Sequence, residues 1–461
     1  MPEPITKSKR VLAFAACAIV AVAVFFAGKS TLGKKTEEET APRPVPVNLN
    51  VTLTNEMSDT SALDGFDRQV KDYLTFWGIQ GASLSVMRND SLLFAKGYGK
   101  ADNGKAMEPG NILRLASVSK LVTAVGIMLL QDNGLLSIKD RVFGPEGILN
   151  DSTFNAAIKD TLYYRITVED LLRHKGGFSR KGGDPMFSTR WIMMQNGWSE
   201  VPTQERLMEL QLRRRLKFVP GTAQEYSNFG YLALSMVIEK VSGMDYETFM
   251  QEYVLKPAGC VDFRIAGNYY KHKYPNEVRY YEPADTEPVE LFDGSGQLVP
   301  RCYGGCDLQV LSGAGGWVAS PTELMKFITA IDPEDSKPDI LQAKTIAYMT
   351  ETDKARYPIG WMQTTVSDDW KRTGSLSGSS AMLKRQHDGF TWVFITNTSS
   401  WAGSRFPSKI SAMMKQALAK VKKWPDRDLF ETAPNIDTGF DPYEPAFPYD
   451  YSQAAESLFV N

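Results

Sequence analysis

The sequence predicts an α+β fold: an antiparallel β-sheet flanked by helices and built from both ends of the chain, with a mostly helical domain inserted between them. Two observations carry this prediction. A hairpin pattern, bordered by an amphipathic helix, stands near each end of the body, and the stretch between the hairpins has apolar residues at helical spacing. We therefore expect one body with its functional site at the junction of sheet and helices.

The first hairpin follows a helix whose apolar residues recur at helical spacing. Residues 82–88 and 92–98 then form two alternating apolar runs, and Asn89-Asp90 between them favours a tight turn. The helix is carried by Phe66, Val70, Tyr73, Leu74 and Trp77.

The second hairpin comprises residues 381–385 and 390–396 around the turn Asp388-Gly389, and a last helix is expected from Pro407 to Trp424. Helical patterns dominate the stretch between the hairpins. They cover residues 121–133, 167–173, 204–216, 229–241 and 321–330.

Five segments follow from these patterns. Residues 63–424 form the folded body, with the helical insertion at about 120–310, and residues 30–62 form a proline-containing linker. Residues 1–29 read as a membrane anchor or signal segment. The tail, 425–461, is rich in proline, aromatic and acidic residues; we expect it to lie along the body as an extended strap, with a partner-binding tail as the alternative.

The N-terminal segment also predicts where the protein resides. Lys7, Lys9 and Arg10 precede an unbroken apolar run at residues 11–27. Positive charges before such a run place the N-terminus in the cytoplasm, so we expect attachment to the cell membrane and a body outside the cytoplasm, in the periplasm. A cleavage site at Ala21-Val22-Ala23 remains open.

Composition excludes several classes of function. With 52 basic and 54 acidic residues the net charge is −2, which argues against nucleic acid as a partner. No phosphate-binding loop or dinucleotide-binding turn occurs. Only three histidines are present, without metal-ligand spacing, so we expect neither a metal nor a cofactor.

Three short motifs carry the candidate chemistry. Ser117-Val118-Ser119-Lys120 opens an apolar helix, which places the hydroxyl and the amine on one face. Burial and neighbouring positive charge would have to deprotonate the lysine before it could act as a base. A serine cap with a solvated lysine is the alternative.

Tyr226-Ser227-Asn228 precedes a second apolar helix. A tyrosine beside the lysine can move a proton between nucleophile, leaving group and water, and the asparagine can hold the lysine and donate to a substrate carbonyl. Arg372-Thr373-Gly374-Ser375 lies just before the second hairpin. It offers a cation for an anionic group and a glycine that lets substrate approach the backbone, or else it is an ordinary exposed edge strand.

The order S-x-x-K, Y-x-N and basic-x-G resembles the serine β-lactamase and penicillin-binding-protein superfamily, and the tyrosine is similar to its class C branch with DD-peptidase and esterase relatives. Residues 166–177, 220–231 and 315–320 also resemble segments of that branch. The resemblance runs from about residue 63 to 420 and implies a β-lactamase/DD-peptidase-like fold.

The resemblance implies a role for each motif residue. Ser117 is the acylated nucleophile, with Lys120 and Tyr226 as its proton-transfer partners, and Asn228 orients Lys120 and the substrate. The backbone amides of Ser117 and Ser375 form an oxyanion hole. The remaining substrate-binding positions are Arg372, Thr373 and Gly374.

Arg372 departs from the lysine or histidine that the family usually carries. Because arginine grips a carboxylate with two parallel bonds but transfers no proton at neutral pH, we expect it to bind a substrate carboxylate. The function implied is a serine hydrolase that acts on D-amino-acid peptides of cell-wall type or on related small amides and esters. A β-lactamase, a broad esterase, or a penicillin-binding sensor that never turns over are the alternatives, and the oligomeric state stays undetermined.

Other residues are given structural interpretations. Cys302 and Cys306 are candidates to pair with each other, or either with Cys260. His174 is expected to be a structural hydrogen-bonding residue. We expect Trp191 and the Met193-Met194 pair to pack within the helical domain.

Overall fold

The computed structural model describes residues 49–431 except 182, 335–338, 352–356 and 365–368. The predicted anchor, most of the predicted linker and the tail from residue 432 lie outside the described residues, so those assignments stay predictions. Within the described part of the chain, no helix combines the length and apolar character that a membrane crossing requires.

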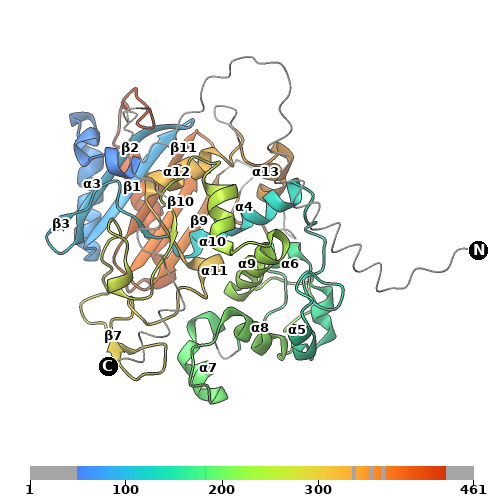
Figure 1. Cartoon of the computed structure of the whole chain (residues 1–461). Coiled ribbons are helices and arrows are strands. Elements are labelled where there is room, and N and C mark those ends of the chain that lie inside the picture. The colour runs from blue at the N-terminus through green and yellow to red at the C-terminus, as the bar shows by residue number, and fades with distance from the viewer. Residues whose placement is uncertain (1–48, 182, 335–338, 352–356, 365–368, 432–461) are drawn as a thin grey trace, which may run out of the picture.

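A six-stranded antiparallel sheet forms one half of the body and confirms the predicted fold class (Figure 1). The strand order is β3-β2-β1-β11-β10-β9, so the two hairpins meet where β1 pairs with β11. Asn89 and Asp90 both have positive φ, as the primed turn of a tight hairpin requires. The strands are β1 (Gly81–Arg88), β2 (Ser91–Asp102), β3 (Lys105–Ala106), β9 (Trp370–Leu376), β10 (Ser379–Arg385) and β11 (Phe390–Thr396).

Two helices cover one face of this sheet. These are α3 (Asp64–Trp77) and α14 (Phe406–Leu418), whose apolar faces share a core cluster with β1, β2, β10 and β11. The helix predicted to reach Trp424 ends at Leu418. Trp424 instead forms a T-shaped ring contact with Phe66 of α3, with the ring centres 5.7 Å apart.

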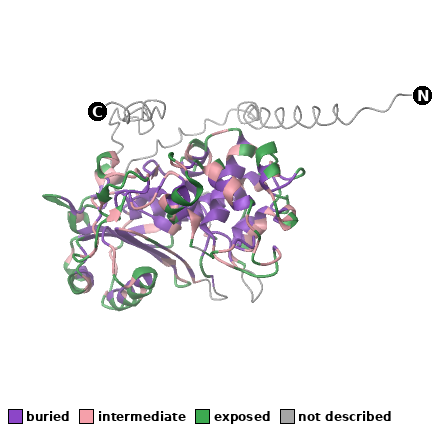
Figure 2. Cartoon of the chain, turned by 90° about the horizontal axis from the view of Figure 1, so that it is seen from below, coloured by how far each residue is buried: buried purple, intermediate pink, exposed green. Residues whose placement is uncertain are grey.

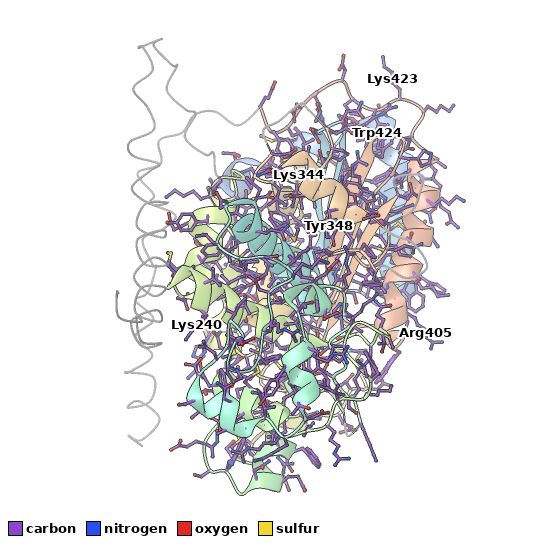
Figure 3. All side chains as sticks on the ribbon, turned by 90° about the vertical axis from the view of Figure 1, so that its right-hand side faces the viewer. Lys240, Lys344, Tyr348, Arg405, Lys423 and Trp424 are labelled. Carbon is purple, nitrogen blue, oxygen red and sulfur yellow. The ribbon has the colours of Figure 1, made fainter. Side chains whose placement is uncertain are left out.

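The other face is covered by the helical region. Its centre is formed by α4 (Ser119–Asp132) and α9 (Asn228–Ser242), which pack together and are buried on nearly all sides, while exposed residues lie at the periphery (Figure 2). Lys240 of α9 and Arg405, next to α14, mark opposite edges of the molecule (Figure 3). The other helices are α5 (Ser152–Ala157), α6 (Val168–Leu172), α7 (Thr189–Asn196), α8 (Gln204–Leu212), α10 (Tyr246–Phe249), α11 (Ser312–Gly315), α12 (Pro321–Thr329) and α13 (Ala343–Thr350).

Short strands complete the helical region. β4 (Leu113–Arg114), β8 (Trp317–Ala319) and β5 (Arg264–Ile265) form a small sheet, and β6 (Val289–Glu290) pairs with β7 (Leu298–Val299). Because β4 ends three residues before Ser117, this small sheet anchors the chain that leads into the Ser117 motif.

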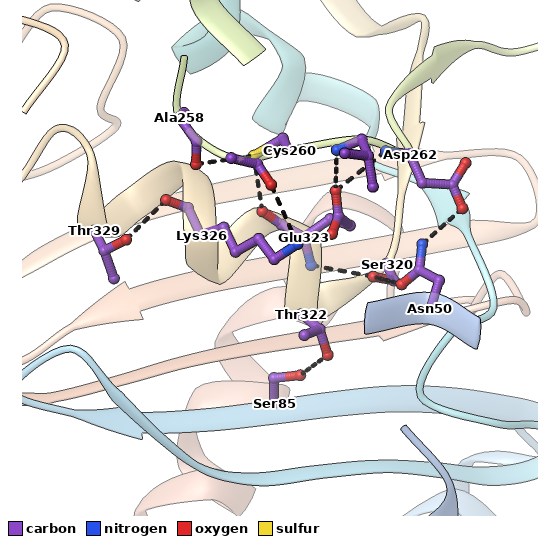
Figure 4. A network of polar contacts seen from close by, with 12 residues as sticks. Asn50, Ser85, Ala258, Cys260, Asp262, Ser320, Thr322, Glu323, Lys326 and Thr329 are labelled. Atoms are coloured by element: carbon purple, nitrogen blue, oxygen red, sulfur yellow. Dashed lines mark hydrogen bonds and ion pairs between the residues drawn. The ribbon is translucent and has the colours of Figure 1, made fainter. Parts of the chain in front are cut away.

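Residues 50–62 contact the body at several points, although the sequence assigned them to the linker. Asn50, in α2 (Leu49–Thr52), donates a hydrogen bond to Asp262 at 2.6 Å and accepts one from Ser320 at 2.6 Å (Figure 4). Leu53 is buried. At the other end, Leu429 is buried and its N–H donates to the Leu92 carbonyl, so the described start of the tail lies along β2 as the strap interpretation predicts.

All three described cysteines are free thiols, so none of the suggested disulfide pairings forms. Cys260 is buried against α12, where its thiol donates to the Glu323 carbonyl. The predicted packing around α7 is wrong in part: Met193 is buried, but Trp191 and Met194 are exposed.

Candidate active site

The first motif folds as a strained turn followed by a helix. Ser117 lies in a 3₁₀ turn, Ala116–Val118, directly before α4. Ala116 has a φ of 48°, a left-handed conformation that is uncommon for a residue with a side chain and is often found at functional sites. The turn leaves Ser117 half-buried, while Ala116 and Val118 on either side are buried.

Lys120 lies beneath this serine and is completely buried. Its Nζ donates to Asn228 Oδ1 at 2.7 Å and to the Ala314 carbonyl oxygen, and it contacts Ser117 Oγ at 3.2 Å. Burial lowers the pKa of Lys120, the charge of Arg372 lowers it further, and Tyr226 opposes the shift. The alternative of a solvated lysine is wrong.

Tyr226 completes the group of side chains around Ser117. Its hydroxyl is 2.7 Å from Ser117 Oγ, and the Lys120 ammonium lies 5.0 Å from the centre of its ring. Burial by itself would raise the pKa of Tyr226, but the positive charges of Lys120 and Arg372 outweigh burial and the net pKa is lowered. The structure thus brings a hydroxyl, an amine and a phenol into contact from two segments more than a hundred residues apart.

Asn228 begins α9 and has a fixed orientation. Its Oδ1 accepts from Lys120, and its Nδ2 donates to Asp184 Oδ2 at 2.7 Å. A carboxylate only accepts hydrogen bonds, so Asp184 determines which end of the amide faces the lysine. Ser227 caps the helix, because its hydroxyl accepts from the N–H of Gly230.

Arg372 occupies a place different from the one predicted. It is 1% exposed, and its Nε donates to the Ser117 carbonyl oxygen at 2.8 Å. A guanidinium that binds a substrate carboxylate must be reachable, whereas this one is buried and holds the backbone of Ser117. Within reach of solvent, the strand instead presents Thr373, which is half-buried, and Ser375, which is exposed.

Gly374 allows β9 to approach the turn that carries Ser117. A Cβ at this position would lie 2.2 Å from the Leu115 carbonyl oxygen and 3.0 Å from the Ser117 nitrogen. Both are backbone atoms, so neither can move aside without displacing the turn. The glycine therefore keeps the backbone of residues 373–375 against Ser117, as an oxyanion hole built from both segments requires.

We expect Gly374→Ala to reduce activity at least about tenfold and to lower the melting temperature, because strand and turn must separate. Gly65→Ala is the matched control: its Cβ would lie 3.6 Å from the nearest atom, and alanine is the better helix former in α3. Thermal unfolding and initial rates of both variants check this. Wild-type behaviour of Gly374→Ala would contradict the close approach.

His174 has the structural role expected of it. Its Nδ1 accepts from the Ser227 N–H at 3.3 Å, and its ring lies 4.6 Å from that of Tyr226. Burial holds the pKa of His174 well below its usual value, and the charges of Arg372 and Lys120 add to this effect. A neutral imidazole therefore supports the Tyr226 motif.

One site residue, Asp184, was not predicted from the sequence. It lies in the loop between α6 and α7, and the Asp184-Pro185 pair signals only the start of a 3₁₀ turn. No cluster of three or more histidine, cysteine or acidic residues suited to a metal ion occurs in the described ranges.

Comparisons with known proteins identify similar sequences and similar folds. The sequence model of the family described as Beta-lactamase matches residues 66–411. Penicillin-binding protein 4* of Bacillus subtilis (strain 168) is 24% identical over 314 residues, covering 65% of this chain and 64% of that protein. A putative D-alanyl-D-alanine carboxypeptidase of Escherichia coli (strain K12) is 26% identical over 230 residues, covering 48% and 49%.

The chain thus spans between about half and two thirds of the length of these curated relatives. Among solved structures, the D-amino acid amidase from Ochrobactrum anthropi SV3 shares the fold, with a TM-score of 0.60 at 19% identity over 79% of this chain and 99% of that one. The family match extends over most of the body and includes all three motifs. The chain therefore belongs to the β-lactamase family.

Proposed function

We propose that this protein is a serine hydrolase that forms an acyl-enzyme on Ser117, and that it acts on D-amino-acid peptides of cell-wall type or on related small amides and esters. One observation carries the proposal: Ser117 Oγ lies within hydrogen-bond distance of both Tyr226 Oη and Lys120 Nζ. The names of its relatives, a penicillin-binding protein and a D-alanyl-D-alanine carboxypeptidase, support the substrate class.

The contacts of Lys120 determine which position of its amine faces Ser117. Asn228 Oδ1 and the Ala314 carbonyl oxygen can only accept, so they hold two Nζ hydrogens and the remaining position faces Ser117 Oγ. In the neutral amine this position is a lone pair that can take the serine proton. In the ammonium it is an N–H that stabilises the serine oxygen.

These contacts support the following reaction. Ser117 Oγ attacks the substrate carbonyl carbon while its proton passes to Lys120 or Tyr226, and the backbone N–H groups of Ser117 and Ser375 receive the negative oxygen. Tyr226 gives a proton to the leaving amine or alcohol as the carbon–leaving-group bond breaks. Water next attacks the ester that joins the acyl group to Ser117, and Tyr226 accepts the proton of the water. The carboxylic acid product then leaves, and Ser117 Oγ regains its hydrogen.

Intact-mass spectrometry over time tests this proposal. The protein is mixed separately with a D-Ala-D-Ala peptide, an activated ester and a β-lactam. Hydrolysis of the ester or the peptide with a transient acyl adduct supports the enzyme. A stoichiometric adduct that persists with every compound, without product, would identify a non-hydrolysing sensor and contradict the proposal.

The pH dependence of activity should respond to Arg372. Its charge lowers the pKa of both Lys120 and Tyr226. One of these groups must lose its proton to activate Ser117, so kcat/KM should rise with pH through that lowered pKa. Removing the charge with Arg372→Gln should raise both pKa values and move the acidic limb of the profile to higher pH.

Lys371→Gln is the matched control, because it removes the same charge from the adjacent position of β9, where the side chain points to the opposite face. Its acidic limb should stay close to that of the wild type. If the acidic limb of the kcat/KM profile does not move in Arg372→Gln, or moves equally in both variants, then the charge of Arg372 does not control the pKa values of Lys120 and Tyr226.

A further inference from the structure

Asp184 places a fixed negative charge within hydrogen-bond distance of Asn228, the residue that holds Lys120. Its Oδ2 accepts from Asn228 Nδ2 at 2.7 Å, and its Oδ1 accepts from the Met186 N–H at 3.0 Å. The Asp184 carbonyl oxygen also accepts from Ser188 Oγ at 3.0 Å. Three contacts therefore hold this residue in place at the start of its 3₁₀ turn.

The carboxylate retains capacity to bind a further group. A carboxylate offers about four acceptor positions, and the two N–H donors use only two of them. Among the described residues, no lysine, arginine or histidine forms an ion pair with Asp184, and the residue is half-buried rather than enclosed. A negative charge in this setting favours a positive partner.

The positive charges of the site are, by contrast, out of reach. Lys120 is 0% exposed and Arg372 is 1% exposed, and both lie behind the serine. Neither of these two cations is accessible to offset the repulsion between Asp184 and a substrate carboxylate. A substrate ammonium would meet a charge of opposite sign.

Two hydrogen bonds of 2.7 Å and one contact of 3.2 Å lead from Asp184 through Asn228 and Lys120 to Ser117 Oγ. In an amino-acid amide or ester the α-nitrogen is two bonds from the carbonyl carbon that the serine attacks. We propose that Asp184 binds this α-ammonium, so that the protein prefers amides, esters and peptides in which the amine next to the scissile carbonyl is free. This inference rests on the proposed function and names the substrate class of that same site.

The test compares two D-phenylalanine p-nitroanilides, one with a free amine and one N-acetylated. Asp184→Asn keeps an oxygen that accepts from Asn228 but removes the charge. We expect the ratio of kcat/KM for the free amine to that for the acetylated compound to fall roughly 10- to 100-fold, the range of a hydrogen bond between charged groups. Glu200→Gln, which removes one exposed negative charge from the helical region, should leave this ratio at the wild-type value.

Burial lowers the pKa of Lys120 and the charge of Asp184 opposes this effect, so Asp184→Asn should also shift the pH profile equally for both compounds. The ratio is therefore taken on the plateau of each profile. Two other outcomes would overturn the proposal. Equal losses on both compounds would make Asp184 only a positioning residue for Asn228. A wild-type preference for the acetylated compound would refute the ammonium site directly. Absence of turnover and of acylation with either compound would instead refute the proposed function itself.

Discussion

Ser117→Ala should abolish turnover, with a loss of at least about a thousandfold in kcat/KM, and should leave the melting temperature nearly unchanged. The loss is large because the covalent intermediate forms on this oxygen, and no neighbouring hydroxyl takes the same place between Tyr226 and Lys120. Stability should hold because Ser117 is only half-buried and alanine fits its turn. Ester hydrolysis and thermal unfolding measure the two quantities.

Ser199→Ala, at an exposed position in the helical region, is the matched control and should keep wild-type rates. Retained turnover in Ser117→Ala would mean that the nucleophile lies elsewhere. A steep fall in its melting temperature would mean that lost activity reports unfolding rather than chemistry.

Lys120→Met should lower kcat by roughly 10²- to 10⁴-fold, the usual contribution of a positioned acid–base group. Methionine has a similar length and no proton to exchange, so Ser117 keeps its hydroxyl but loses the base beneath it. Single-turnover kinetics with an activated ester should show slower acylation. Lys240→Met, at an exposed position on α9, should behave as wild type.

Combining Lys120→Met with Tyr226→Phe tests whether the two side chains act together. If lysine and tyrosine act as one proton-transfer unit, the double variant should be little worse than the poorer single variant, as found for catalytic residues that act together. Losses that multiply in full would show that the two side chains act in separate steps.

The predictable part of this fold was local in sequence. The Asn89-Asp90 turn fixes one hairpin through backbone conformation, and Ser117 and Lys120 are three residues apart, so both patterns are visible without tertiary contacts. The order of the motifs carried the resemblance that linked Tyr226 to them. These signals sufficed to predict both the sheet and the group around Ser117.

The remaining features depend on long-range packing. Asp184 reaches Asn228 across 44 residues of sequence through an otherwise ordinary loop, so no pattern marks it. Whether the Arg372 side chain faces substrate or the core depends on how closely β9 approaches the turn at Ala116. Gly374 permits this approach, but a glycine in the sequence does not by itself predict it. The exposure of Trp191 likewise follows from the placement of α7 rather than from its composition.

The central claim is that Ser117 carries the acyl group. Rapid quenching of the wild-type protein during hydrolysis of an activated ester, followed by tryptic peptide mapping, tests it most directly. Cleavage after Arg114 and Lys120 releases a peptide of residues 115–120, and fragmentation distinguishes Ser117 from Ser119 within it. We predict the acyl mass on Ser117; the same mass on another residue, or turnover without any acylated peptide, would contradict the account.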